Sequence, residues 1–309
     1  MSRSSVPHDT HRERQLHSVS VLGLGYMGTA IAKAFARKGH QVSVWNRSSG
    51  KASALTALEH NVNAYETAGA CIQASQLVIT VITDSRAFKA IVESLDPTVG
   101  SGKTLVNFST GTPSEVLKSS ELTKDKSFDA FIQGAMLAYP AQVGLPETNA
   151  LYSGPVEYFE PIKESLEVLG KAVYLDDEDP TRAALQEAMI DTAYYTVCAG
   201  YLSAMALLKR SGLWKPGLAE PFTREWIVPI LQLSEHYLVP IAQQMDSGKY
   251  KDENGCRLSN HLSSLRTFVR TYEEFNVESI GLTSFADSIE KRISQGGGDE
   301  ELSGMVDSL

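Results

Sequence analysis

Cysteine is scarce in this chain, and its cysteines form no recognisable cluster. The 309 residues include three, Cys71, Cys198 and Cys256, with no CxxC pair and no zinc-type spacing of Cys and His. An odd, dispersed set excludes a disulfide framework or a structural metal site as the basis of the fold. We therefore expect free thiols in a reducing, cytoplasmic compartment, with each cysteine serving as a small buried apolar residue.

The chain also lacks an excess of positive charge and any long apolar run. It has 28 Lys and Arg against 37 Asp and Glu, which gives a net charge of −9. No segment gathers the basic residues that phosphate binding needs, so we expect no nucleic-acid partner. The longest uncharged run, residues 192–208, contains Thr, Ser and Tyr and falls short of the roughly 20 apolar residues of a membrane span. Residues 1–17 are polar and are expected to form a disordered tail rather than a signal peptide.

Short apolar runs alternate with helical patterns over the first half of the chain. The pattern predicts strands at residues 18–23, 41–45, 77–83, 103–108, 128–132 and 150–153. It predicts helices at residues 27–38, 51–59, 86–95, 113–120 and 157–169. Strands that alternate with helices are typical of the α/β class with a mostly parallel, doubly wound sheet.

The pattern changes after Leu175. The acidic segment 176–180 suits the first turn of a helix, and only Gly200 interrupts the helical residues from Pro180 to about Arg210. The remainder predicts helices alone, at 220–245, 258–275, 284–294 and 300–307, with Pro229 and Pro240 expected to kink or divide the first of them. We therefore divide the chain into a tail (1–17), an α/β domain (18–176), a connecting helix (177–210) and a helical domain (211–309).

A glycine-rich motif follows the first predicted strand and opens the first predicted helix. In that setting the glycines of a G-x-G-x-x-G pattern allow a tight turn, a close approach of a pyrophosphate and close packing of helix on strand. Free N–H groups and the helix dipole then attract the phosphates. The motif predicts a dinucleotide site formed by Gly23, Leu24, Gly25, Tyr26, Met27 and Gly28.

The end of the second predicted strand indicates which dinucleotide is bound. A protein that uses NAD places Asp or Glu here to bind the ribose hydroxyls. This chain has Trp45-Asn46-Arg47-Ser48 instead, with Lys51 one turn further on. Arg47 and Lys51 offer positive charge to a 2′-phosphate, and Asn46 and Ser48 offer hydrogen bonds. We therefore predict NADPH as the cofactor.

Polar residues also follow the third and fourth predicted strands. Thr83 ends the third, and Ser109 and Thr110 follow the fourth. The carboxyl ends of parallel strands share one edge of the sheet, where ligands bind. We expect all three residues to line the cofactor site, and Ser109 or Thr110 to contact the nicotinamide or the substrate. The alternative for Ser109 and Thr110 is capping of the helix that begins at Pro113, and both roles stay open.

Several of these segments resemble one known family. GLGYMGTAIAKAFARKGH, VWNRS, VNFSTGTP and IQGAMLAYP are similar to motifs of the β-hydroxyacid dehydrogenase superfamily, the last two to its imine reductase and reductive aminase branch. The segment PTRAALQEAMIDTAYYTVCAGYLSAMAL resembles the interdomain helix of imine reductases. The resemblance implies a domain-swapped homodimer. It also implies an N-terminal Rossmann domain that binds NADP, a C-terminal domain for dimerisation and substrate, and an active site between one subunit's Rossmann domain and the other's helices.

The resemblance also points to catalytic residues on the long helix. Hydroxyacid dehydrogenases of this superfamily use a Lys there, but residues 180–208 contain no Lys. The matching position is Glu187, where imine reductases usually carry Asp or Tyr. A carboxylate there balances the charge of an iminium as it forms and shuttles a proton. Asp191 is the rival for that role, and Tyr195, on the same helix face, matches a tyrosine of fungal reductive aminases.

The same resemblance implies substrate-pocket residues, namely Leu137, Ile230, Asn260 and His261. Members that couple an amine to a carbonyl often have an aromatic residue where this chain has Ile230, which argues against efficient coupling here.

We therefore expect NADPH-dependent reduction of an imine or iminium, with reductive amination of a carbonyl by an amine as an extension of that activity. Two alternatives stay open. One is an NADP-dependent β-hydroxyacid or carbonyl dehydrogenase, and the other is an NADPH-binding protein without catalysis.

Overall fold

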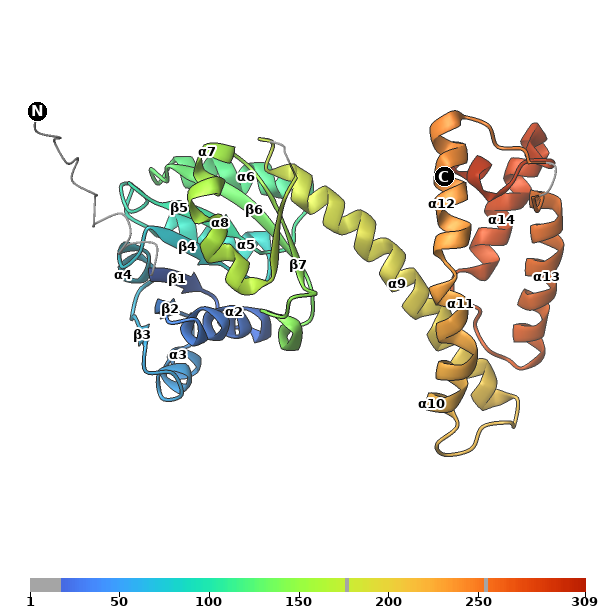
Figure 1. Ribbon diagram of the computed structural model, residues 1–309, viewed down its shortest axis with the longest axis horizontal. Coiled ribbons are helices and arrows are strands. Elements are labelled where there is room, and N and C mark those ends of the chain that lie inside the picture. The colour runs from blue at the N-terminus through green and yellow to red at the C-terminus, as the bar shows by residue number, and fades with distance from the viewer. Residues whose placement is uncertain (1–17, 176–177, 253–254) are drawn as a thin grey trace, which may run out of the picture. The chain divides into compact units, whose positions relative to one another are not determined.

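The computed structural model describes residues 18–175, 178–252 and 255–309 (Figure 1). The predicted tail at 1–17 lies outside them, as do Asp176 and Asp177 of the acidic segment. The chain divides into two compact units between Ile190 and Asp191. This boundary lies inside the long helix that the sequence predicts as a connecting element.

The first unit is an α/β domain. It contains an eight-stranded sheet and helices that cover both faces of it (Figure 1). Its elements are β1 (Ser18–Leu22), α2 (Tyr26–Arg37), β2 (Gln41–Trp45), α3 (Ser49–Thr56), β3 (Val62–Ala64), α4 (Ala68–Gln73), β4 (Leu77–Thr80), α5 (Ser85–Glu93), β5 (Thr104–Asn107), α6 (Pro113–Lys124), β6 (Ala130–Leu137), η1 (Pro140–Gln142), β7 (Asn149–Ser153), α7 (Val156–Phe159), η2 (Glu160–Ile162), α8 (Lys163–Leu166), η3 (Glu167–Leu169) and β8 (Lys171–Tyr174).

The strand order is β3-β2-β1-β4-β5-β6-β7-β8. Among the described strands, β6 and β7 pair antiparallel and the other neighbours pair parallel. The order reverses between β1 and β4, because the chain returns from β3, at one edge of the sheet, to the free side of β1. This reversal is the switch point at which a doubly wound sheet opens a crevice beyond the strand ends. The predicted α/β class with a doubly wound sheet is therefore confirmed.

Two hydrophobic cores, one on each face of the sheet, hold this unit together. On one face, Phe35 of α2 and Phe159 and Leu166 of the α7–α8 region pack with the strands. On the other, Phe88 of α5 and Val116 of α6 do so. Strands buried on both faces explain why the predicted runs are almost continuously apolar.

Local differences from the predicted elements have physical causes. The helix predicted at 157–169 is broken into α7, η2, α8 and η3, because Pro161 lacks the N–H that a continuous helix needs there. The patterns in the sequence do not predict β3, α4 or β8, which are six residues long or shorter. The strand predicted at 128–132 is β6, and it extends to Leu137.

The second unit is helical. The 30-residue α9 (Thr181–Arg210) begins in the first unit and ends in the second. It is followed by α10 (Ala219–Phe222), η4 (Thr223–Ile227), α11 (Val228–Gln232), α12 (Glu235–Ser247), α13 (Leu258–Glu274), α14 (Leu282–Arg292), η5 (Ile293–Gly297) and η6 (Leu302–Asp307). The single helix predicted at 220–245 is divided: a π-helical turn precedes Pro229, and the chain breaks again between α11 and α12. Pro240, by contrast, lies inside α12.

The cysteine predictions are confirmed in part. All three thiols are free. Cys71 is buried, as expected, but Cys198 is half-buried and Cys256 is exposed, so the expectation that each is a buried apolar residue was wrong for these two. Cys256 precedes α13 in a surface segment, where no core is available to cover it.

Candidate active site

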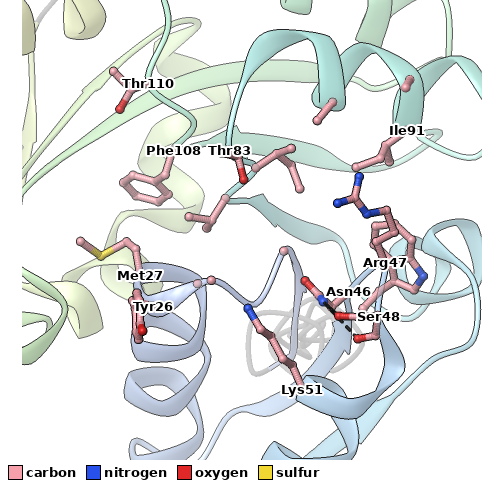
Figure 2. A pocket seen from close by; sticks show the side chains of 18 of the residues that line it. Tyr26, Met27, Asn46, Arg47, Ser48, Lys51, Thr83, Ile91, Phe108 and Thr110 are labelled. Atoms are coloured by element: carbon pink, nitrogen blue, oxygen red, sulfur yellow. Dashed lines mark hydrogen bonds between the residues drawn. The ribbon is translucent and has the colours of Figure 1, made fainter.

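A cavity of about 670 Å³ opens at the carboxyl ends of β1, β2, β4 and β5, at the switch point of the sheet (Figure 2). Its size is within the range of cofactor pockets. The lining residues are Gly23, Gly25, Tyr26, Met27, Gly28, Trp45, Asn46, Arg47, Ser48, Lys51, Val81, Ile82, Thr83, Ala87, Ala90, Ile91, Ser94, Phe108, Thr110, Met136 and Glu187.

The glycine-rich loop connects β1 to α2 and forms the floor of the cavity. Gly23 has a φ of +95°, and a Cβ on it would collide with the carbonyl of Val81. A Cβ on Gly28 would collide with the carbonyl of Gly23, so both positions need glycine for the turn itself. Gly25 is different, because nothing lies within 4 Å of the place where its Cβ would be. Its bare backbone faces open space at the start of α2, where a pyrophosphate can approach the helix N-terminus.

The side chain of Asn46, the residue directly after β2, holds this loop in place. The Oδ1 atom of Asn46 accepts the backbone N–H of Leu24 at 2.9 Å. The Nδ2 atom of Asn46 donates to the Oγ of Ser48 at 2.9 Å. Leu24 itself is buried in the core and does not line the cavity. Leu24 and Asn46 therefore fix the shape of the loop, and Asn46 and Ser48 also line the cavity.

The cationic side of the cavity is formed by Arg47 and Lys51 (Figure 2). Both side chains are exposed. Within the described parts of the chain, neither has an ion-pair or hydrogen-bond partner among the protein's own side chains. Two cations beside Ser48, with no carboxylate nearby in the lining, fit a phosphate group.

Beyond the glycine loop, the lining residues differ in character from those of the cationic side. Phe108 and Thr110 come from the segment after β5, Met136 from β6, and Glu187 from α9. Figure 2 shows Phe108, Thr110 and Met27 well away from Arg47 and Ser48. Glu187 is the one carboxylate among the described lining residues. This end of the cavity therefore combines apolar walls, the hydroxyl of Thr110 and the carboxyl group of Glu187.

Ser109 does not line this cavity. It is buried, and its Oγ accepts the backbone N–H of Ile82 at 2.9 Å. Nor does Ser109 or Thr110 cap α6, because Thr112 does so. The Oγ1 of Thr112 accepts the N–H of Glu115 at 3.3 Å, and the Glu115 carboxylate accepts the N–H of Thr112 at 2.8 Å. The capping alternative for Ser109 and Thr110 was therefore wrong.

Glu115 also connects α6 to α5. Its carboxylate accepts the hydroxyl of Ser85 at 2.6 Å. This bond, together with those from Thr112, lowers the pKa of Glu115 below its ordinary value. At the start of α5, Asp84 accepts the N–H of Ala87 at 2.8 Å and caps that helix. The two helices behind the cavity are therefore fixed at their N-termini by side chains.

The remaining predicted site residues lie elsewhere. Leu137 ends β6, is half-buried and does not line the cavity. The others belong to the second unit, namely Asp191 and Tyr195 on α9, Ile230 on α11, and Asn260 and His261 in the first turns of α13. Asp191 is half-buried, and Tyr195 packs edge-on against Tyr194 with ring centroids 5.5 Å apart. Their roles stay predictions.

Several lining residues were missed by sequence reasoning. They are apolar or small, and most lie on α5 or in the segments that flank it, namely Val81, Ile82, Ala87, Ala90, Ile91 and Ser94. Trp45, Phe108 and Met136 were missed as well. Phe108 directly precedes the predicted Ser109, and the reversal of side-chain direction along an extended segment was the available signal.

Among the described residues, no group of three or more His, Cys, Asp or Glu is placed to hold a metal ion. None of the described helices has the length and apolar character needed to cross a membrane.

Two family models match the chain. Residues 18–175 match the NAD binding domain of 6-phosphogluconate dehydrogenase. Residues 179–309 match the C-terminal domain described as NADPH-dependent reductive aminase-like.

Individual proteins resemble the chain over almost its whole length. An NADPH-dependent reductive aminase of Aspergillus oryzae is 30% identical over 94% of this chain and 96% of its own. The structure of a reductive aminase from Aspergillus terreus in complex with NADPH and ethyl levulinate is 30% identical with a TM-score of 0.86, and covers 94% of this chain and 98% of its own. The structure of an imine reductase from Pseudomonas sp. is 25% identical with the same TM-score and coverage.

Proposed function

The chain belongs to the family of NADPH-dependent reductive aminases and imine reductases, and from this premise we propose that Glu187 is the charge partner of the iminium that it reduces. The protein is an NADPH-dependent oxidoreductase that acts on carbon–nitrogen double bonds. The observation that supports the role of Glu187 is its position as the one carboxylate among the described residues of the cofactor cavity.

The cavity fits the cofactor. Gly23 and Gly28 hold the turn, and Gly25 leaves its backbone open to the pyrophosphate. Arg47, Lys51 and Ser48 are the residues that would bind the 2′-phosphate. When bound, NADPH would supply the hydride, and Phe108, Thr110, Met136 and Glu187 are the residues that would surround its nicotinamide end.

The charge on Glu187 favours a C=N substrate over a C=O substrate. An iminium already carries the positive charge that makes its carbon electrophilic, and a carboxylate close to it stabilises that charge. Reduction of a ketone places negative charge on oxygen and needs a proton there, which an ionised carboxylate supplies poorly. The stretch 180–208 offers no Lys as an alternative donor.

The test compares the two carboxylates of α9. NADPH consumption is measured with a cyclic imine such as 1-pyrroline, in the wild type, in Glu187→Gln and in Asp191→Asn. Glu187→Gln keeps the shape of the side chain and is expected to lower kcat by about 100-fold or more, with the affinity for NADPH retained. A larger loss in Asp191→Asn would move the role to Asp191. Equal turnover in all three proteins would exclude a carboxylate role for either residue.

A second set of assays extends the test to substrates. Cyclohexanone with an added primary amine measures coupling, and β-hydroxyacids with NADP⁺ measure dehydrogenase activity. We expect preformed cyclic imines to react faster than the coupled pair, since Ile230 stands where coupling relatives often carry an aromatic residue. Faster oxidation of β-hydroxyacids than reduction of imines would overturn the proposal.

We further propose that the protein acts as a homodimer. The second unit has a small core of its own, formed mainly by Leu258, Ile289 and Met305. Many of its large apolar side chains are exposed instead, among them Leu202, Trp226, Ile230, Tyr237 and Leu238, each about 60% accessible. Exposed apolar surface on this scale marks an association surface. Light scattering coupled to size-exclusion chromatography is expected to give twice the chain mass of 33.7 kDa. A monomer would contradict the proposal.

We propose a cytoplasmic location. The support is the set of three free thiols, which is typical of proteins in a reducing compartment.

A further inference from the structure

A row of buried polar side chains crosses three neighbouring strands, at the carboxyl ends of β4 and β5 and in the middle of β6. Thr80 of β4 is in register with Asn107 of β5, which is in register with Gln133 of β6. All three are almost fully buried. Side chains at paired positions of adjacent strands lie on the same face of a sheet, so the three can contact one another directly.

The row is connected by hydrogen bonds. The hydroxyl of Thr80 donates to the Oδ1 of Asn107 at 2.8 Å, and the Nδ2 of Asn107 donates to the Oε1 of Gln133 at 2.9 Å. The Nε2 of Gln133 donates in turn to the carbonyl of Gly134 at 3.0 Å and to the carbonyl of Ser109 at 3.3 Å. Because Gln133 both accepts and donates, an acid or an apolar residue in its place cannot reproduce this arrangement.

The network holds one residue, Ser109, from three sides. The carbonyl of Ser109 accepts from Gln133, its N–H donates to the Oδ1 of Asn107 at 3.2 Å, and its Oγ accepts the N–H of Ile82. The two neighbours of Ser109 in sequence, Phe108 and Thr110, both line the cofactor cavity. The hydrogen bonds that hold Ser109 therefore also hold the segment 108–110, which contributes Phe108 and Thr110 to the wall of the cavity.

The ring of Phe108 is constrained as well. A Cβ on Gly134, the residue after Gln133, would collide with this ring, so the ring lies directly on the backbone of β6. Its other side contacts Tyr152, with ring centroids 5.7 Å apart. The bond from Ile82 to Ser109 also connects this wall to the segment after β4, which lines the same cavity.

We propose that Gln133, acting with Asn107, is a positioning residue for hydride transfer. The two buried amides hold the Phe108–Thr110 segment in place, and this segment in turn sets the position of the nicotinamide ring. Neither amide lines the cavity, and both act through Ser109. This inference rests on the proposed function, which places the nicotinamide at that end of the cavity.

The test uses Gln133→Met, which keeps the length of the side chain and removes its donors and acceptor. Ser20→Ala is the matched control. Ser20 is also fully buried and donates one hydrogen bond, to the carbonyl of Cys71, but it does not line the cavity. The measurements are kcat and KM with 1-pyrroline, the dissociation constant of NADPH, the fluorescence lifetime of bound NADPH and the primary isotope effect with deuterated NADPH.

If the nicotinamide is displaced in Gln133→Met, a specific combination of results is expected. In Gln133→Met, kcat falls by about 10- to 100-fold and the isotope effect rises, because a small displacement of the reacting atoms slows hydride transfer. The dissociation constant of NADPH changes by less than about threefold, since the residues that hold the phosphates are unaltered. The fluorescence lifetime of bound NADPH shortens because its ring is held less firmly. Ser20→Ala shows none of these changes.

Other results overturn the inference. A parallel loss of NADPH affinity and kcat in Gln133→Met, or an equal loss in Ser20→Ala, shows a purely structural role. If Gln133→Met does not fold, Thr80→Val is used, because it removes only the outermost bond of the row; an unchanged kcat and lifetime in that variant then count against the inference. The fluorescence and binding measurements need no substrate, so they distinguish its failure from a failure of the proposed function.

Discussion

The hydroxyl of Ser153, the last residue of β7, accepts the backbone N–H of Ala183 in the first turn of α9 at 2.9 Å. The same hydroxyl donates to the carbonyl of Pro180 at 2.9 Å. Ala183 is fully buried against Ala135 and Leu151. Glu187 follows one turn later on the same face of the helix, so the start of α9 is attached to the sheet at the point that sets the position of this carboxylate.

Replacing Ser153 by Ala is therefore expected to affect both stability and catalysis. The variant removes the partner of the Ala183 N–H and one hydrogen bond to the carbonyl of Pro180, which costs about 1–2 kcal/mol of unfolding free energy. Glu187 loses its fixed position, so kcat for imine reduction falls. The affinity for NADPH is retained, because the residues expected to bind its phosphates are unaltered. Urea unfolding and steady-state kinetics measure the two effects.

Ser119→Ala is the control for this prediction. Ser119 is buried on α6 and donates to the carbonyl of Glu115 at 2.9 Å, so the variant loses a comparable bond away from α9. An equal fall of kcat in both variants would show that Ser153 has no special connection to Glu187.

Replacing two glycines of the loop by alanine is expected to affect stability and NADPH binding differently. In Gly25→Ala the new Cβ meets no protein atom, so the unfolding free energy stays within about 1 kcal/mol of the wild type. Binding of NADPH is nevertheless lost, because the Cβ enters the space that the pyrophosphate needs. In Gly28→Ala the Cβ collides with the carbonyl of Gly23, and stability falls by about 1–3 kcal/mol together with binding. Thermal unfolding and NADPH titration separate the two cases, and normal NADPH binding by Gly25→Ala would contradict this account of the loop.

The sequence predicted the parts of the site that depend on local spacing. The glycine loop and the Asn46–Lys51 segment are short, contiguous motifs at strand ends, and the cavity brings them together as expected. The parallel sheet followed from the order of its apolar runs. Glu187 was proposed from the family resemblance, and its position in the cavity results from Ser153, which no spacing along the chain connects to it.

The parts that the sequence did not predict depend on contacts between distant segments. The row from Thr80 to Gln133 exists because three strands, separated by more than 20 residues each, have one particular register. A polar residue inside an apolar run gives no sign of whether its partner is water or another buried amide. The apolar wall contributed by α5 was missed for a similar reason, since Ala87 and Ile91 have the spacing of any helix that packs on a core.

Burial raises the pKa of the Cys71 thiol to about 12, from an ordinary value of 9.0. The folded protein therefore keeps this proton at pH values where the unfolded chain releases it. The resulting contribution to stability is fully present below about pH 9 and is lost as the pH rises toward 12, at about 1.4 kcal/mol per pH unit. Urea unfolding of the wild type and Cys71→Ala at pH values between 8 and 10.5 is expected to show the wild type losing stability relative to the variant only above pH 9.

Thiol reactivity gives an independent check of the same burial. An aromatic disulfide reagent at about pH 8 is expected to modify the exposed Cys256 in the folded protein and to leave Cys71 unmodified until urea is added, because only the thiolate reacts. Rapid modification of Cys71 without denaturant would contradict the burial of this residue.

Cofactor preference is expected to depend on the two cations at the end of β2. A guanidinium can bind a phosphate through two hydrogen bonds, so if Arg47 has the proposed role, Arg47→Ala raises the KM for NADPH by about 10- to 100-fold. Lys51→Ala gives a smaller rise, since an ammonium on an exposed, flexible side chain binds less tightly. The KM for NADH stays nearly unchanged in both variants because NADH has no phosphate at this position.

The preference for NADPH is also expected to depend on ionic strength. Both side chains are exposed, so salt screens their attraction for the phosphate, and the advantage of NADPH in the wild type shrinks as ionic strength increases. Steady-state kinetics with each cofactor at low and high salt measures all of these effects. An equal loss for NADPH and NADH in Arg47→Ala would mean that this side chain supports the adenosine as a whole, and the choice of NADPH would then need another explanation.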